Sequence, residues 1–153
     1  MTDYDISEKE LAPQLALTYR TTSSMATIAD SMGAAFGTLM QHAGQTGAQW
    51  AGPPFVLYLS VNEDEVEMVV CMPVVPGAQG GDQVALEEIP GGRAATTMHV
   101  GPYSEIQHAY TALQQWIADA DCHPAGPPRE VYLNDPSQVA ESELLTEIDW
   151  PIA

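Results

Sequence analysis

The sequence predicts an α+β fold built as a tandem βαββ repeat with pseudo-two-fold symmetry. Ala51-Gly52-Pro53-Pro54 recurs as Ala125-Gly126-Pro127-Pro128, and a strand-like segment with a central tyrosine follows each copy. In both halves the apolar spacing changes in the same order, from strand to helix and back to two strands. The length of 153 residues and the hydrophobic fraction of 45% suit one globular domain. We therefore expect an antiparallel sheet with two main helices on one face and a cleft on the other.

The first half, about residues 14–75, opens with a short apolar strand over 15–20. Residues 25–42 carry Met, Ile, Phe and Leu side chains at helical spacing, which predicts a helix. A loop rich in glycine and proline follows. Strands over 55–60 and 65–72, joined by a polar turn, then complete the half as a hairpin.

The second half, about residues 93–152, repeats this order. Its predicted strand, helix and two hairpin strands cover residues 94–99, 105–120, 130–134 and 144–150. Ser104 is placed to cap the helix N-terminus. Every third or fourth residue of the helix is apolar, so one of its faces is expected to pack on the sheet. Two short polar segments, 62–64 and 135–137, are the predicted hairpin turns.

Residues 76–92 lie between the halves and are rich in glycine and proline, which indicates a connector. Each half has only about 60 residues and one helix, too little to bury a stable core alone. Burying both halves together gives the more stable unit. We therefore expect one domain over residues 1–153.

Charge is the most unusual feature of the composition. The chain has 21 acidic residues against four Lys and Arg, a formal net charge of −17. Binding to DNA, RNA or anionic membranes is disfavoured because it depends on Lys and Arg. Cationic ligands would be attracted, although such acidity also serves simply to keep a protein soluble.

Nothing in the sequence predicts a metal or a cofactor. Cys71 and Cys122 lie far apart, and the four histidines show no i, i+4 pair on a helix. No stretch reaches the roughly 18 to 20 apolar residues of a membrane span, and the first residues are polar and acidic, unlike a signal peptide. We expect a soluble, cytoplasmic protein.

Strand alternation suggests which side chains face a pocket. In the last strand Thr146 and Ile148 share the face expected to meet the helices, so Glu147 points the other way. The same reasoning places Tyr132 and Tyr58 beside Glu147. The predicted ligand-binding residues are Glu147, Tyr132, Tyr58, Trp50, Tyr110, Val69 and Glu67. Tyrosine rings around a carboxylate suit a flat aromatic cation, but glutamate and tyrosine are also ordinary residues of a half-solvated sheet face.

Three segments together resemble a known family: 101–117 beginning Gly-Pro-Tyr, 127–136 containing Tyr-Leu-Asn-Asp-Pro, and the Thr-Glu-Ile of 146–148. The chain is similar to the GyrI-like small-molecule-binding family, which includes the effector-binding domains of bacterial multidrug-sensing AraC- and MerR-type regulators. The resemblance covers essentially the whole chain. It implies a tandem βαββ fold with a ligand cleft between the halves for hydrophobic, often cationic compounds. It also implies that Glu147 is the acid that meets the ligand's charge.

Three functions follow from this resemblance. The first is a stand-alone multidrug-binding protein. The second is a hydrolase of reactive cyclopropane-type genotoxins, in which Glu147 activates water and Tyr132 donates a proton. The third is a module that binds gyrase or a separate regulator. No helix-turn-helix segment is recognisable before residue 15, so we expect no direct DNA binding.

Overall fold

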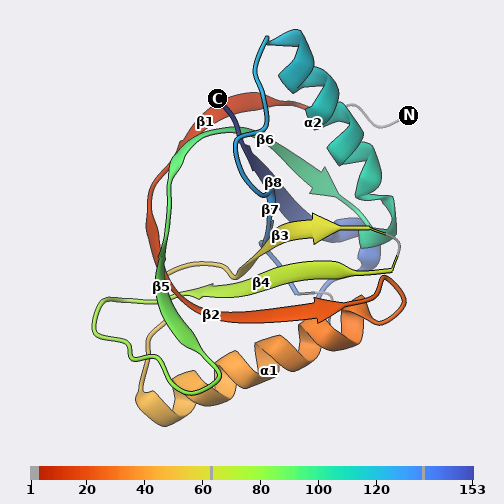
Figure 1. Ribbon diagram of the computed structural model, residues 1–153. Helices are drawn as coiled ribbons and strands as arrows, with labels where there is room; N and C mark the ends of the chain where they lie inside the picture. The colour runs from red at the N-terminus through yellow and green to blue at the C-terminus, as the bar shows by residue number, and fades with distance from the viewer. Residues whose placement is uncertain (1–3, 63, 136) are drawn as a thin grey trace. The chain divides into compact units, whose positions relative to one another are not determined.

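The computed structural model describes residues 4–62, 64–135 and 137–153. The chain forms two compact units, unit 1 from Met1–Ala12 with Gly91–Ala153 and unit 2 from Pro13–Pro90. Each unit contains four antiparallel strands and one α-helix (Figure 1). The predicted α+β class and the βαββ order of each half are confirmed. Glu63 and Pro136, at the centres of the predicted hairpin turns, lie outside the described residues.

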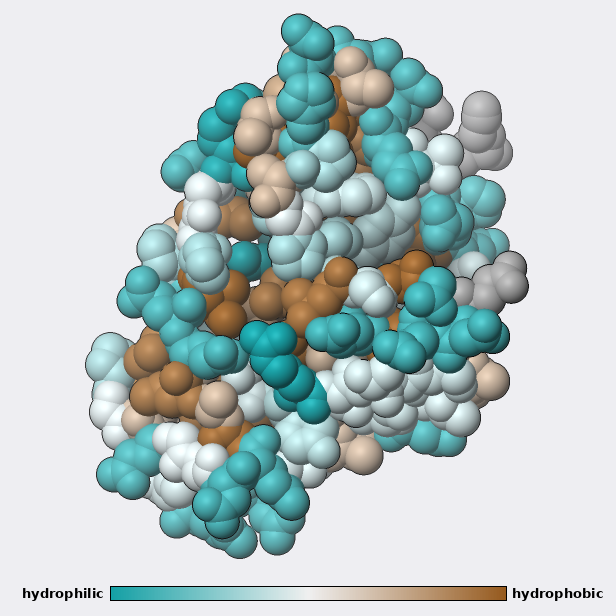
Figure 2. Space-filling view, in the orientation of Figure 1, coloured by the Kyte–Doolittle hydropathy of each residue, from teal (hydrophilic) through white to brown (hydrophobic). Residues whose placement is uncertain are grey.

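Hydrophilic residues cover much of the face seen in Figure 2, and hydrophobic residues gather in smaller areas between them. This distribution agrees with the excess of acidic residues in the sequence. Among the described residues, neither α-helix combines the length and the apolar character that crossing a membrane requires.

Unit 2 has a sheet in the order β3-β4-β2-β5. Its elements are β2 (Gln14–Ser23), α1 (Ile28–Thr46), β3 (Phe55–Val61), β4 (Val66–Pro73) and β5 (Ala85–Ile89). The helix contacts β2 and β4 and buries Ala35, Leu39 and Ala43. All residues of β4 except Glu67 are buried, so this inner strand is covered on both faces.

The helix α1 begins three residues later and ends four residues later than the apolar spacing predicts. It ends where Gly47 adopts a φ of 75°, and the Gly47 amide donates a hydrogen bond to the Ala43 carbonyl at 2.8 Å. Glycine adopts this left-handed conformation without the steric penalty of a side chain, so it forms the helix C-terminus.

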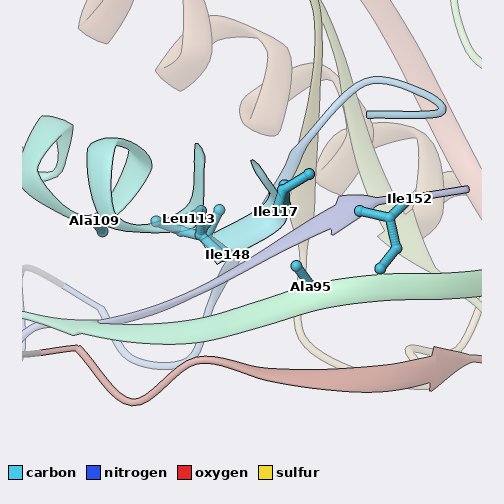
Figure 3. Packing of buried hydrophobic residues seen from close by; sticks show 6 residues of the cluster. All are labelled: Ala95, Ala109, Leu113, Ile117, Ile148 and Ile152. Carbon is cyan, nitrogen blue, oxygen red and sulfur yellow. The ribbon is translucent and has the colours of Figure 1, made fainter. Parts of the chain in front are cut away.

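Unit 1 has a sheet in the order β1-β6-β8-β7. Its elements are β1 (Ser7–Leu11), β6 (Gly92–Val100), the 3-10 turn η1 (Tyr103–Glu105), α2 (Gln107–Asp119), β7 (Arg129–Tyr132), the 3-10 turn η2 (Glu141–Glu143) and β8 (Leu145–Pro151). The buried face of α2 packs on the sheet through a core seen in Figure 3, formed by Ala95, Ala109, Leu113, Ile117, Ile148 and Ile152.

Within unit 1, His99 of β6 links the segment before β1 to the rest of the sheet. The buried His99 ring hydrogen-bonds to the Tyr4 hydroxyl through Nδ1 and to the Pro102 carbonyl through Nε2, both at 2.9 Å. Because a carbonyl can only accept, Nε2 is the donor.

Two strands were not predicted. Residues 76–92 were expected to be a connector, but Ala85–Ile89 form β5 and pair with β2, and β1 pairs with β6. Both are edge strands. β1 belongs to unit 1 but comes just before unit 2 in the chain, and β5 belongs to unit 2 but comes just before β6 of unit 1. The predicted cap at Ser104 was also wrong, because Ser104 lies inside η1 and α2 begins at Gln107.

Candidate functional site

The pairing of β7 with β8 decides which side chains share a face of unit 1. Glu130 is paired with Ile148, and Tyr132 with Thr146. Paired residues of antiparallel strands point to the same side of a sheet. Because Ile148 packs against α2, Glu130 and Tyr132 also lie on the α2 face, whereas Glu147 points away from it.

Strand alternation was therefore right for β8 and wrong by one residue for β7. We expected Tyr132 to lie beside Glu147, on the face away from the helix. Instead Val131 is paired with Glu147, on the opposite face from Tyr132. A strand of four residues gives little periodicity, and Val131 is buried without facing α2, so its apolar side chain gave the wrong parity.

On the α2 face, a buried carboxylate is held by two tyrosines. Glu130 is only 8% exposed. The Tyr110 hydroxyl of α2 donates a hydrogen bond to Glu130 Oε2 at 2.6 Å, and the Tyr132 hydroxyl donates to Oε1 at 2.9 Å. Hydroxyl bonds to a carboxylate are stronger than bonds between neutral groups, which offsets part of the cost of burying Glu130.

Two further aromatic rings support these tyrosines. The Tyr103 ring meets the Tyr132 ring edge to face, with centroids 5.8 Å apart, and Trp150 meets Tyr110 in the same way at 5.9 Å. Burial, and then the negative charges of Glu130 and Asp135, raise the pKa of Tyr103 above its usual value. We name Tyr103, Tyr110, Glu130, Tyr132 and Trp150 the tyrosine–Glu130 cluster.

Local sequence explains how the cluster is placed. Gly101, with a φ of 124°, turns the chain from β6 into η1, and its amide donates to the Leu144 carbonyl at 2.9 Å. This turn places Tyr103 over β7. Asn134 closes the link to β8, because its Oδ1 accepts the Leu145 amide and its Nδ2 donates to the Glu143 carbonyl, both at 2.9 Å.

The other face of unit 1 carries an ionised pair. Lys9 of β1 lies 2.9 Å from Glu147 Oε2, and the Thr96 hydroxyl donates to Asp149 Oδ1 at 2.6 Å. Burial, and then the hydrogen bond with Glu147, raise the pKa of Asp149 to about 7. Burial alone would raise the pKa of Glu147, but the hydrogen bonds from Asp149 and Lys9 outweigh it and hold that pKa below its usual value.

Below about pH 7, Asp149 is therefore the protonated partner and donates its hydrogen bond to the ionised Glu147. The charge of Glu147 is already paired with the Lys9 ammonium. A cationic ligand that used Glu147 would have to displace this side chain. Among the described residues, no cluster of three His, Cys, Asp or Glu side chains could hold a metal.

The remaining predicted site residues belong to unit 2. Tyr58 is paired with Met68 and Leu57 with Val69, so Tyr58 lies on the opposite sheet face from Val69. Val69 is fully buried and Glu67 is exposed. Trp50 is 43% exposed and forms an isolated bridge with Val74 beyond the end of β4.

The structure thus brings together two of the predicted residues, Tyr110 and Tyr132, and adds Glu130, Tyr103 and Trp150. The signal for Glu130 was its spacing from Tyr132, since residues two apart in a strand share a face. Tyr103 was visible only as part of a loop motif.

Comparison with known proteins agrees with this fold. Residues 4–153 match the family described as the GyrI-like small molecule binding domain. A comparison with curated proteins gave no match. Among solved structures, the chain is similar to EcmrR in a complex with DNA, with a TM-score of 0.86 and 23% identity over 97% of this chain. The chain spans 57% of that EcmrR chain.

The isolated C-terminal domain of EcmrR is similar over 98% of both chains, with a TM-score of 0.84 and 23% identity. A hydrolase from Listeria innocua has a TM-score of 0.67 and 15% identity, covering 97% of this chain and 91% of the hydrolase. SAV2435 bound to tetraphenylphosphonium has a TM-score of 0.63 and 11% identity, covering 99% and 94%. At these identities the structures show a shared fold, and the family match spans nearly every residue. The chain therefore belongs to the GyrI-like small molecule binding domain family.

Proposed function

We propose that this protein binds bulky hydrophobic cations, and that the tyrosine–Glu130 cluster is the part of the site that recognises their charge. The observation that carries the proposal is a carboxylate buried among aromatic rings, Glu130 with Tyr110 and Tyr132. Cations are attracted to aromatic ring faces. At an effective dielectric near 20, a charge about 4 Å from the carboxylate gains on the order of 4 kcal/mol before desolvation is deducted.

The family and the overall charge support this choice of ligand. Members are described as small molecule binding domains, and SAV2435, which has a similar fold, is bound to the hydrophobic cation tetraphenylphosphonium. The net charge of −17 would attract cations over long distances. Multidrug binding by a single cytoplasmic domain over residues 1–153, without direct DNA contact, is part of the same proposal.

The ligand-binding roles of Tyr58, Trp50, Val69, Glu67 and Glu147 stay separate predictions, each to be tested by its own substitution. Glu147 lies on the opposite sheet face from the tyrosine–Glu130 cluster, and its charge is already paired with Lys9. Removing the charge of Glu130 should therefore weaken cation binding more than removing that of Glu147.

Calorimetric titration with tetraphenylphosphonium tests this proposal, with neutral triphenylphosphine oxide as the control ligand. We expect selective binding of the cation, a loss of about tenfold or more in Glu130→Gln, and a loss of less than about threefold in Glu147→Gln. A larger loss of affinity in Glu147→Gln than in Glu130→Gln would mean that the cation binds on the other face of unit 1. Equal binding of the cation and the neutral compound to the wild type would overturn the proposal.

A second candidate function is hydrolysis of a strained electrophile. The predicted pair, Glu147 with Tyr132, cannot act on one bond because these residues lie on opposite faces of the sheet. Glu130 and Tyr132 are in contact, however. Glu130 would accept a proton from water as the water oxygen bonds to the ring carbon, and Tyr132 would donate a proton to the oxygen that accepts the electrons of the broken ring bond.

Product formation distinguishes the two functions. An enzyme would convert many equivalents of a cyclopropane-type probe and lose this turnover in Tyr132→Phe, whereas a binder would protect at most one equivalent. A pull-down from cell extract with purified gyrase as the competitor addresses the remaining expectation, a partner protein such as gyrase or a separate regulator.

A further inference from the structure

We propose that the hydroxyl groups of Tyr110 and Tyr132 make the site selective for cations without hydrogen-bond donors, such as quaternary ammonium and phosphonium ions, over protonated primary amines. The inference rests on the proposed function and names the class of cation that the same site takes. Tyr110 and Tyr132 act in it as specificity-determining residues.

Two tyrosine hydroxyls donate hydrogen bonds to Glu130 from different elements of unit 1. Its Oε2 accepts the Tyr110 hydroxyl at 2.6 Å and its Oε1 accepts the Tyr132 hydroxyl at 2.9 Å, so each carboxylate oxygen already has a donor. The first tyrosine comes from α2 and the second from β7. Glu130 is only 8% exposed, so little of its surface is open to a donor that enters from water.

The tyrosines are held in these positions by neighbouring rings. Trp150 meets the ring of Tyr110 at an interplanar angle of 76°, and Tyr103 meets that of Tyr132 at 75°. Moving either hydroxyl away from Glu130 would break a ring contact as well as a hydrogen bond. Each hydroxyl is therefore held in place both by its hydrogen bond to Glu130 and by a contact of its ring.

A protonated primary amine loses more hydrogen bonds to water than a quaternary ion does when it binds beside Glu130. The amine brings three N–H donors, each of which loses a water molecule on entry and needs a new acceptor. The oxygens of Glu130 already accept the two tyrosine hydroxyls, so an amine would compete with these hydroxyls for the carboxylate. A quaternary ion has no donors to satisfy, and it gains the attraction of the buried charge and of the ring faces without displacing any group.

The experiment compares two ligands that share one hydrophobic group, 4-phenylbenzyltrimethylammonium and 4-phenylbenzylammonium, by calorimetry at pH 7. The proteins are the wild type, Tyr110→Phe, Tyr132→Phe and the control Tyr4→Phe. The control also loses a hydroxyl bond, but to His99 and away from Glu130. Because both ligands are measured on the same protein, a general loss of stability affects them equally and leaves their ratio unchanged.

We expect the wild type and Tyr4→Phe to prefer the quaternary ion by about tenfold or more. Each cluster variant removes one hydroxyl donor from Glu130, so the ratio should fall at least about threefold, mainly through tighter binding of the primary amine. Equal affinities in the wild type, or an unchanged ratio in both cluster variants, would overturn the inference while leaving cation binding intact. If neither cation binds the wild type, both the inference and the proposed function fail.

Discussion

Asp149 and Glu147 lie two residues apart on one face of β8 and hold a single proton between them near neutral pH. The proton stays on Asp149, which is the more deeply buried of the two carboxyl groups, and Lys9 keeps Glu147 ionised. This relationship couples the stability of unit 1 to pH.

The first prediction concerns that coupling. The folded pKa of Asp149 is raised to about 7, so near pH 5.5 the folded chain holds a proton that the unfolded chain, with an ordinary pKa near 3.9, has released, and by about pH 8 both states have released it. Its contribution to stability is therefore present at low pH and lost as the pH rises through about 7. In Asp149→Asn, the amide can still accept from Thr96 and donate to Glu147 but does not titrate.

Chemical denaturation across this range should show the wild type losing at least about 1.4 kcal/mol relative to Asp149→Asn, the equivalent of one pKa unit. Parallel curves for the two proteins would contradict the shared proton.

The second prediction concerns Lys9. Replacing it by glutamine removes the cation 2.9 Å from Glu147, so the pKa of Glu147 should rise. The loss of stability should stay within about 1 kcal/mol and shrink at high salt, because 42% of the Lys9 side chain is exposed. Carboxyl NMR titration measures the pKa. Glu10→Gln, an exposed change on the same strand, is the control and should leave Glu147 unaffected.

The third prediction tests the core beneath α2. Leu113 is fully buried among Ala95, Ile117 and Ile148, so Leu113→Ala should cost about 2–5 kcal/mol through lost packing and a residual cavity. Urea denaturation measures this loss. Gln114→Ala, at an exposed position of the same helix, should change stability by less than about 0.5 kcal/mol. A similar effect of both substitutions would mean that this face of α2 is not packed on the sheet.

The fourth prediction compares two glycines. Gly101 has a φ of 124°, a conformation that side chains rarely adopt, so Gly101→Ala should cost about 1–3 kcal/mol and displace Tyr103. Gly37 lies within α1 with nothing within 4 Å of an added Cβ. Gly37→Ala should therefore stabilise the protein by about 0.5–1 kcal/mol. Thermal unfolding measures both changes, which should have opposite signs.

Much of the fold could be predicted because its signals are local. Among the described residues, the repeated Ala-Gly-Pro-Pro segment and the apolar spacing located both helices and six of the eight strands to within a few residues. The two missed strands are sheet edges. Ser7–Leu11 contains Glu8, Lys9 and Glu10, so it shows no apolar alternation, and its partner β6 lies far along the chain.

The site was harder to predict because it depends on register. Tyr110 and Tyr132 were predicted to bind ligand, but not to contact Glu130. That contact forms because Glu130 and Tyr132, and not the apolar Val131 between them, face α2. The partner of Glu147 could not be predicted either, because Lys9 lies 138 residues away in the sequence. The ligand-binding role of Glu147 stays a prediction.

The exchange of edge strands between the halves affects how the chain folds during synthesis. Every strand of unit 2 lies within Pro13–Pro90, so all its strand partners are synthesised before β6. During this time β1 has no partner, because it pairs with β6. A waiting strand can pair with another nascent copy. The three charged side chains of β1, Glu8, Lys9 and Glu10, are hydrated and disfavour such pairing until β6 is made.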